Sequence, residues 1–346
     1  MKLLERMGMF AATVCTGVAL LAASPASAAD ALEKTKVSIA VGGKSSFYYL
    51  PLTLADRLGY FKDEGLSIEI NDFAGGAKAL QAVVGGSADV VSGAYEHIID
   101  MQTKNQAFKA VVLQGRYPDV AIGISKTKFA SYKSPADMKG LTVGVTAPGS
   151  STHIILAHFL VQNGLKPTDV SIVGVGATAG AVAALRAGKI DAISNIDPAI
   201  TMLESTGDIK VVADARTTAG SKALFGGPVP AGCLYAPTEF IEKNPKTVQA
   251  MTTAMVRALK WLQTATPEQV ASTVPADYLV GDKPLYIATF QKVRESYSPD
   301  GMVPEEGAKT ALKMTSAFNP AISAASVKLD QTYDNRFAQT AQQKLK

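Results

Sequence analysis

Two short segments of small, hydrogen-bonding residues each lie between a predicted strand and a predicted helix. The first covers residues 42–46 (GGKSS), after a strand at 36–41, and the second covers residues 148–153 (PGSSTH), after a strand at 141–145. Small residues let a backbone approach a ligand, amides at a helix start carry partial positive charge, and hydroxyls add donors. The pattern favours a site for a sulfonate, carboxylate or nitrate, with plain helix capping as the alternative. The candidate ligand contacts are Lys44, Ser45, Ser46, Ser150, Ser151 and Thr152.

Two further loops each present one carboxylate near the same predicted cleft. Residues 92–97 (SGAYEH) follow a strand at 88–92, and residues 195–198 (NIDP) follow a strand at 190–194. A buried carboxylate must be paired or hydrogen-bonded. Asp197 either meets an ammonium group of a ligand or caps the helix that Pro198 begins. Glu96 binds the ligand, pairs with Lys44 or Arg116, or starts a helix. These loops supply the candidate contacts Tyr95, Glu96, Asn195 and Asp197.

Aromatic and cationic side chains complete the predicted site. Tyr48 and Tyr95 are candidates for an apolar wall with a polar tip, and ordinary packing is the alternative for Tyr48. Arg116, which follows a strand at 110–113, is the candidate charged partner for an anion, or else a surface residue of a hinge. The sequence leaves open whether Tyr49, His153 or the glycines at 226–227 touch the ligand.

Catalytic chemistry has little support in the residue pattern. A thiol pair of Cys233 with His153 is conceivable, but no local motif accompanies it, and a lone cysteine is more often a small buried apolar residue. His158 lies within a predicted helix and is expected to be structural. The sequence has no metal-ligand spacing, phosphate loop or dinucleotide fingerprint. We therefore expect a binding protein without cofactor or metal rather than an enzyme.

The first residues form a processing signal. Lys2 and Arg6 precede an apolar stretch at about 7–23, and Ala26 and Ala28 give the small-x-small pattern of a cleavage site, expected after residue 28. Such a signal predicts export to the periplasm as a freely diffusing protein. Only Cys233 then remains, so no intramolecular disulfide is expected. The net charge of +4 comes without a long Lys/Arg run, so no nucleic-acid partner is implied.

Strands and helices alternate along residues 36–92 and again along residues 141–194, which indicates parallel sheets covered by helices. The segment LQAVVGGSADVVSG (80–93) resembles VAALRAGKIDAISN (182–195), and Asp89 and Ser92 match Asp191 and Ser194 at one offset. Two similarly built α/β lobes follow from this repeat. After residue 214 we expect a loop and a returning strand, followed by helices. Asn244 is expected to cap one of these helices, with Pro245 at its first position and an apolar stripe that faces a core.

Three segments together resemble the nitrate/sulfonate/taurine family of substrate-binding proteins of ABC importers. They are YYLPLTLADRLGYFKDEGLSIEI (48–70), GGAKALQAVVGGSADVVSG (75–93) and MKGLTVGVTAPGSSTHIILAHFLVQNGLKPTDVSIV (138–173), and the similarity covers about 36–240. The resemblance implies a type II periplasmic-binding fold, with two α/β lobes, a two-strand hinge near 116–124 and 214–234, and a ligand cleft between the lobes. The corresponding division is a signal peptide at 1–28, lobe 1 at 29–118, lobe 2 at 119–215, and the rest of lobe 1 with C-terminal helices at 216–346.

The resemblance also implies a function. The chain is expected to capture a small anion (an aliphatic sulfonate, taurine, nitrate or a related organic acid) and to deliver it, as a monomer, to an ABC permease in the inner membrane. The alternatives are a binding protein that reports to a sensor system and an enzyme of the same fold. The resemblance matches no single ligand subgroup.

Overall fold

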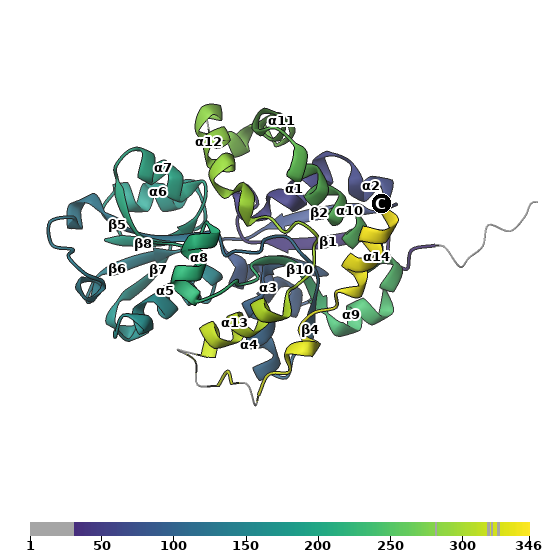
Figure 1. The fold of residues 1–346 in the computed structure, drawn as a ribbon, viewed down its shortest axis with the longest axis horizontal. Coiled ribbons are helices and arrows are strands. Elements are labelled where there is room, and N and C mark those ends of the chain that lie inside the picture. Colours follow the sequence, from purple (N-terminus) through teal and green to yellow (C-terminus); the bar gives the residue numbers. More distant parts are fainter. Residues whose placement is uncertain (1–30, 281, 317–318, 320, 324–325) are drawn as a thin grey trace, which may run out of the picture. The chain divides into compact units, whose positions relative to one another are not determined.

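The computed structural model describes residues 31–346 except 281, 317–318, 320 and 324–325, so the predicted signal peptide lies outside the described residues. Residues 32–346 form one compact unit. Their strands build two five-stranded mixed sheets with helices packed on them (Figure 1), which confirms the predicted α/β fold. We call the first sheet with its helices lobe 1 and the second sheet with its helices lobe 2.

Both sheets have the same arrangement, with three parallel strands followed by an antiparallel strand in fourth place. In lobe 1 the order is β2-β1-β3-β10-β4, and in lobe 2 it is β7-β6-β8-β5-β9. The lobe 1 strands are β1 (Lys36–Val41), β2 (Ser67–Asp72), β3 (Val90–Ala94), β4 (Phe108–Leu113) and β10 (Gly232–Pro237). The lobe 2 strands are β5 (Val120–Ser125), β6 (Thr142–Val145), β7 (Ser171–Gly174), β8 (Ala192–Ile196) and β9 (Ile209–Asp214).

Two expected strands lie two residues later in the chain than the sequence pattern indicates. β3 ends at Ala94 rather than at residue 92, and β8 ends at Ile196 rather than at residue 194. The extra residues pair with strands from the other half of the chain: Ala94 lies opposite Gly232, and Ile196 lies opposite Val120. Local composition does not reveal such pairing, so the loops that carry Glu96 and Asp197 are shorter than predicted.

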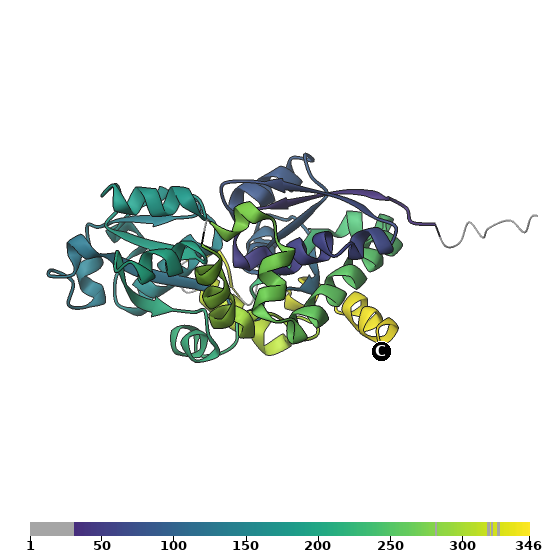
Figure 2. The ribbon, with the colours of Figure 1, turned by 90° about the horizontal axis from the view of Figure 1, so that it is seen from above.

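Helices cover both sheets, and those of the C-terminal part lie mostly on lobe 1. Lobe 1 has α1 (Leu50–Arg57), α2 (Tyr60–Asp63), α3 (Gly76–Val84) and α4 (Glu96–Thr103), and lobe 2 has α5 (Ser151–Gln162), α6 (Ala179–Arg186), α7 (Ala199–Ser205) and α8 (Thr218–Phe225). The later helices are α9 (Thr238–Lys243), α10 (Pro245–Thr264), α11 (Pro267–Thr273), α12 (Lys283–Val293), α13 (Glu305–Ser316) and α14 (Arg336–Lys344). Figure 2 separates the teal elements of lobe 2 from the purple elements of lobe 1.

The predicted C-terminal helix is confirmed as α10, and its apolar stripe is buried in the core of lobe 1. The expected side-chain cap is wrong: the Asn244 amide donates back to the Phe240 carbonyl instead of accepting from the first turn of α10. Alternation along β5 divides the lobe 2 core, with Ala121 on one face of the sheet and Ile122 on the other. None of the helices in the described part of the chain is long and apolar enough to cross a bilayer.

The chain passes from lobe 1 to lobe 2 between β4 and β5 and returns between β9 and β10. The second passage contains α8, so it is longer than the simple loop and strand that the sequence suggests. The expected boundaries at 118/119 and 215/216 fall within these two passages, and the division into domains stays a prediction.

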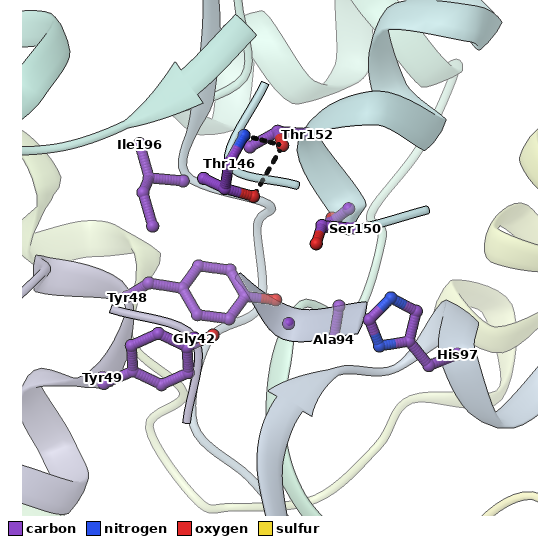
Figure 3. A pocket seen from close by; sticks show the side chains of 11 residues that line it. Gly42, Tyr48, Tyr49, Ala94, His97, Thr146, Ser150, Thr152 and Ile196 are labelled. Carbon is purple, nitrogen blue, oxygen red and sulfur yellow. Dashed lines mark hydrogen bonds between the residues drawn. The ribbon is translucent and has the colours of Figure 1, made fainter. Parts of the chain in front are cut away.

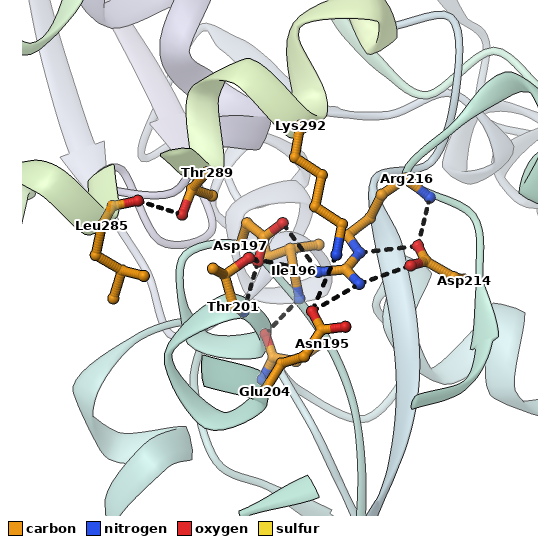
Figure 4. A network of polar contacts seen from close by, with 10 residues as sticks. All are labelled: Asn195, Ile196, Asp197, Thr201, Glu204, Asp214, Arg216, Leu285, Thr289 and Lys292. Carbon is orange, nitrogen blue, oxygen red and sulfur yellow. Dashed lines mark hydrogen bonds and ion pairs between the residues drawn. The ribbon is translucent and has the colours of Figure 1, made fainter. Parts of the chain in front are cut away.

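A buried charge cluster lies where the second passage leaves β9 (Figure 4). The Arg216 guanidinium is 0% exposed and pairs with Asp214 at 2.6 Å, Glu204 at 3.1 Å and Asp197 at 3.4 Å. Lys292 of α12 also reaches Glu204, at 3.0 Å, so the cluster joins the C-terminal helices to lobe 2. A charge that loses its hydration must be compensated by such partners.

Arg216→Met is expected to lower the unfolding free energy by about 3–5 kcal/mol, because it leaves the buried Asp197 carboxylate without its cation. Urea denaturation of both proteins measures the difference. Arg336→Met is the matched control, since that guanidinium is 84% exposed in its pair with Asp334 and its loss should change stability little. Equal effects of the two substitutions would contradict a structural role for the cluster.

Candidate functional site

A small cavity, partly open to solvent, lies between residues of the two lobes. Figure 3 shows Tyr48, Tyr49 and His97 of lobe 1 facing Thr146, Ser150 and Thr152 of lobe 2. The full lining is Gly42, Tyr48, Tyr49, Gly76, Ala94, His97, Thr146, Ser150, Ser151, Thr152 and Ile196. The lining therefore combines apolar surface with hydroxyl, imidazole and helix-start groups.

The lobe 1 wall consists of two tyrosines and a histidine. Tyr48 and Tyr49 belong to a single 3-10 turn before α1 and meet edge to face at 5.1 Å between ring centroids. Burial raises the pKa of the Tyr48 phenol well above its usual value, so the hydroxyl stays protonated at neutral pH. Among the described residues neither the Tyr48 hydroxyl nor His97 Nε2 has a hydrogen-bond partner. Two buried polar groups thus remain available to a ligand.

The lobe 2 wall is the start of α5. Thr152 Oγ1 accepts from the Thr146 amide at 3.0 Å and contacts Thr146 Oγ1 at 2.9 Å. The first turn is anchored by the His153 and Ile154 amides, which both donate to the Ser150 carbonyl. No backbone hydrogen bond of the described residues uses the amides of Ser151 or Thr152. These free amides at the positive end of a 12-residue helix suit an anion.

The two walls meet where α3 begins opposite α5. The Ala77 amide of α3 donates to Ser150 Oγ at 3.0 Å, which joins the lobes directly. Gly75 makes this approach possible: a Cβ there would lie 2.8 Å from Ala147 Cβ and 2.9 Å from Ser150 Oγ. A larger residue at this position would hold the lobes apart.

Four of the predicted ligand contacts line the cavity, and their roles stay predictions: Tyr48, Ser150, Ser151 and Thr152. Tyr49, which the sequence left undecided, also lines it. His97 was not among the predicted contacts, although it belongs to residues 92–97, which carry Tyr95 and Glu96. Its position one residue after Glu96, at the start of α4, was the available signal.

The predicted contacts from the first segment and from the loop after β3 lie outside the lining. The Lys44 amide donates to Asp72 at 2.9 Å, the Ser45 side chain makes no hydrogen bond to another described residue, and Ser46 is buried with an unpartnered hydroxyl. The Tyr95 hydroxyl contacts Thr332 Oγ1 at 2.5 Å. Glu96 is buried, and one of its carboxylate oxygens has no partner among the described residues.

Arg116, the expected charged partner, is also placed elsewhere. Its Nε donates to the Glu295 carbonyl at 2.8 Å, and its guanidinium lies over the Tyr117 ring at 5.2 Å. It borders a separate hollow with Ser298 and Asp300. The residues that line the cavity, all of them described, include no lysine or arginine.

Asn195 and Asp197 are engaged within lobe 2. The Asn195 amide donates to the Gly176 carbonyl at 2.9 Å. Asp197 accepts from both the amide and the hydroxyl of Thr201 at 2.8 Å, in addition to its pair with Arg216. Asn195 therefore ties β8 to the loop between β7 and α6, and Asp197 supports the turn between β8 and α7. The Asp197 carboxylate accepts from the first turn of α7, the capping contact that was predicted as the alternative to a ligand.

Cys233, His153 and Gly226 do not form a catalytic group in the structure. Burial raises the pKa of the Cys233 thiol well above its usual value, which opposes thiolate formation. His153 Nδ1 accepts from the Gly149 amide at 3.0 Å, and Gly226 ends α8. No set of three or more His, Cys, Asp and Glu side chains in the described part of the chain has metal-binding geometry.

Comparisons with known proteins agree with this architecture. A family model described as NMT1/THI5 like matches residues 46–270. A solved structure from Bordetella bronchiseptica RB50 is 55% identical, with a TM-score of 0.89, and the match covers 91% of this chain and 99% of that one.

Two more distant structures show the fold. The alkanesulfonate-binding protein SsuA from Xanthomonas axonopodis pv. citri, bound to MOPS, is 19% identical with a TM-score of 0.66, covering 88% of this chain and 100% of that one. The periplasmic nitrate-binding protein NrtA from Synechocystis PCC 6803 is 15% identical with a TM-score of 0.71, covering 91% and 90%. These similarities confirm the predicted periplasmic-binding fold with two lobes.

Lowering the pH from about 7.5 to 5 is expected to destabilise the protein through its buried histidine at the cavity. Burial is the largest influence on the pKa of His97 and lowers it, against a smaller opposing effect of Glu96. The unfolded state then binds more protons below a pKa of about 6.5, so the unfolding free energy falls as pH falls through this range.

His97→Gln isolates this effect, since its unfolding free energy should depend less steeply on pH than that of the wild type. Denaturant titrations at a series of pH values give both curves. The other titrating groups are common to the two proteins and cancel in the difference. Parallel curves would show that His97 does not contribute.

Proposed function

The chain belongs to the NMT1/THI5-like family, and from this membership we propose that it is the substrate-binding component of an ABC importer that captures a small anion. In this proposal the exported protein binds its ligand in the periplasm as a monomer and delivers it to a permease in the inner membrane. One observation carries the choice of ligand: the cavity between the lobes is lined by hydrogen-bond donors from both.

The donors are neutral, and this bears on which anion fits. The Ser151 and Thr152 amides lie at a helix start, where partial positive charge favours an anion by about 0.3–1 kcal/mol, and more when partly buried. A hydrogen bond to a charged group contributes about 1.5–3 kcal/mol. Because the lining has no lysine or arginine, hydrogen bonds must offset the free energy needed to remove the anion from water. A singly charged anion with delocalised charge, such as a sulfonate or nitrate, has the lowest cost.

An amino-sulfonate such as taurine fits less well than a simple sulfonate. Its ammonium group would need a carboxylate at the cavity, and the lining includes none. Asp197, the carboxylate considered for this role, already pairs with Arg216 and accepts from Thr201. We therefore favour an anion that carries no ammonium group.

Binding, rather than catalysis, is supported by the same residues. The lining offers hydroxyl groups, but among the described residues none of them is hydrogen-bonded to His97, as a nucleophile would be to its base. Contacts from both lobes instead suit a ligand that holds the closed arrangement, as in other two-lobed proteins that close around small molecules.

Small singly charged anions are expected to raise the melting temperature of the protein without its first 28 residues, because a ligand that binds only the folded state stabilises it. A thermal-shift screen would compare nitrate, ethanesulfonate, acetate and taurine with neutral sugars and with choline as a cation. We expect shifts with nitrate or ethanesulfonate and a smaller one with taurine. Shifts confined to the neutral or cationic compounds would refute the anion proposal.

Ser151→Ala is expected to weaken binding of the anion selected by that screen about ten- to hundredfold, the loss of one hydrogen bond to a charged group. Titration calorimetry measures the affinity, and thermal melting measures the stability. Thr266→Ala is the matched control, because Thr266 caps α11 by accepting from the Gln269 amide. It should lose about 1 kcal/mol of stability with unchanged affinity. If Ser151→Ala binds the anion as tightly as the wild type does, Ser151 is not a ligand contact.

A further inference from the structure

His97 lies between the cavity and Tyr235, a residue of β10 that does not itself line the cavity. The imidazole is 3% exposed, and its Nδ1 lies 3.2 Å from the Tyr235 hydroxyl. Its other nitrogen, Nε2, makes no hydrogen bond of normal geometry among the described residues, although the Gly149 backbone lies close enough to the ring to raise its pKa, and Figure 3 shows the ring at the cavity. One nitrogen of the ring is therefore engaged from within lobe 1, and the other is left to the cavity.

The ring has little freedom to turn away from this position. At the start of α3, a Cβ on Gly76 would come within 3.2 Å of His97 Cε1, so the ring packs directly against the glycine backbone. On its other side, the Tyr235 ring is fully buried and packs edge to face with Phe108. Burial raises the pKa of Tyr235 well above its usual value, so this residue remains a phenol with a proton to donate.

Hydrogen-bond accounting decides between the two neutral forms of the imidazole. If Tyr235 donates to Nδ1, the phenol proton and the Nδ1 lone pair are both satisfied, and the proton on Nε2 points to the cavity. If Nδ1–H donates to Tyr235 instead, the phenol proton has no hydrogen-bond acceptor among the described residues, and Nε2 offers only a lone pair. The second arrangement leaves two buried groups unsatisfied where the first leaves one, so the first arrangement is favoured.

We propose that Tyr235 is a positioning residue that holds His97 as an Nε2–H donor and thereby makes the site selective for a ligand with an acceptor oxygen. This inference rests on the proposed function, since it specifies how the same cavity recognises its anion. An oxygen of a carboxylate, sulfonate or nitrate would accept the hydrogen bond from the otherwise unsatisfied Nε2–H of His97. A ligand that presents an N–H at this point meets a second donor and is disfavoured, because both protons then lose their acceptors.

The site gains its selectivity without a fixed positive charge. Burial, the largest influence, lowers the pKa of His97, so the ring is neutral at neutral pH. The Tyr48 hydroxyl and the amides at the start of α5 supply further neutral donors around the cavity. Neutral donors disfavour an ammonium group, because donors would then face donors. They bind an anion only if its oxygen atoms lie within hydrogen-bond distance of them.

The tautomer can be observed directly in the protein labelled with 15N-histidine, with no ligand added. Long-range 1H–15N correlation spectra at pH 7.5 show which nitrogen of each imidazole is protonated, and His97→Gln assigns the His97 signals. We expect a proton on Nε2 and a bare Nδ1. Tyr235→Phe should introduce a second population with the proton on Nδ1. A proton on Nδ1 in the wild type, or a doubly protonated ring, would overturn the inference.

Tyr117→Phe is the matched control for Tyr235→Phe. Tyr117 is also a buried phenol, and its hydroxyl accepts from Thr218 Oγ1 at 2.8 Å, away from His97. Its loss should leave the His97 spectrum as in the wild type. If both substitutions change that spectrum alike, the effect of Tyr235 is general destabilisation and its positioning role fails.

Titrations with nitrate, ethanesulfonate and acetate test the recognition step. For whichever of these probes binds the wild type, His97→Leu should weaken affinity about ten- to hundredfold, and His97→Gln, which restores an N–H, should recover most of it. Unchanged affinity in His97→Leu would overturn the specificity role. If none of the three probes binds the wild type, the proposed anion function fails, and the spectra still decide the tautomer on their own.

Discussion

The fully buried guanidinium of Arg216 needs anionic partners, and residues from several elements of the structure supply them. Arg216 has no contact with solvent, so its charge must be balanced where it lies. Asp197 at the end of β8, Asp214 at the end of β9 and Glu204 of α7 all converge on it, and Lys292 brings α12 to the same carboxylate group of Glu204. The cluster thereby fixes the end of the second sheet and the passage back to lobe 1. Asp119, in the other passage, is also buried beside Asp197, and burial raises its pKa well above the usual value.

This arrangement explains why charge is kept away from the cavity. Asp197 directly follows Ile196, a lining residue, but its carboxylate is directed to Arg216 and the start of α7. The cavity therefore receives the backbone and apolar side chain of this turn, and the ionic groups remain behind it. The donors that face the cavity are neutral hydroxyl, amide and imidazole groups. Affinity in such a site depends on how many of them one ligand reaches at once, and this requires that α3 and α5 meet as closely as Gly75 allows.

The structural relatives are consistent with an architecture that is shared and a cavity lining that differs between proteins. The fold is shared with proteins whose names refer to alkanesulfonate and to nitrate, at identities that carry the architecture and no more. Under the proposed function, ligand choice depends on a few side chains at the cavity, among which His97 packs against Gly76 and Tyr235. His97 acquires its constraint from Tyr235, whose strand β10 joins the first sheet only after the chain has passed through lobe 2.

The sequence by itself determined the alternating α/β pattern, the start of α5 at Ser151 and the buried stripe of α10, because these depend on local periodicity and on nearby helix-start residues. It also placed Tyr48 and the serines at 150–151 in the right segments. Only the tertiary structure decided that β3 and β8 extend two residues further, since their partners come from distant parts of the chain. The same holds for Arg116, which donates to the Glu295 carbonyl, and for His97, whose Nδ1 contacts the hydroxyl of Tyr235 far along the sequence. Side-chain direction and hydrogen-bond partnership across such separations are set by packing, and packing has no local signature in the chain.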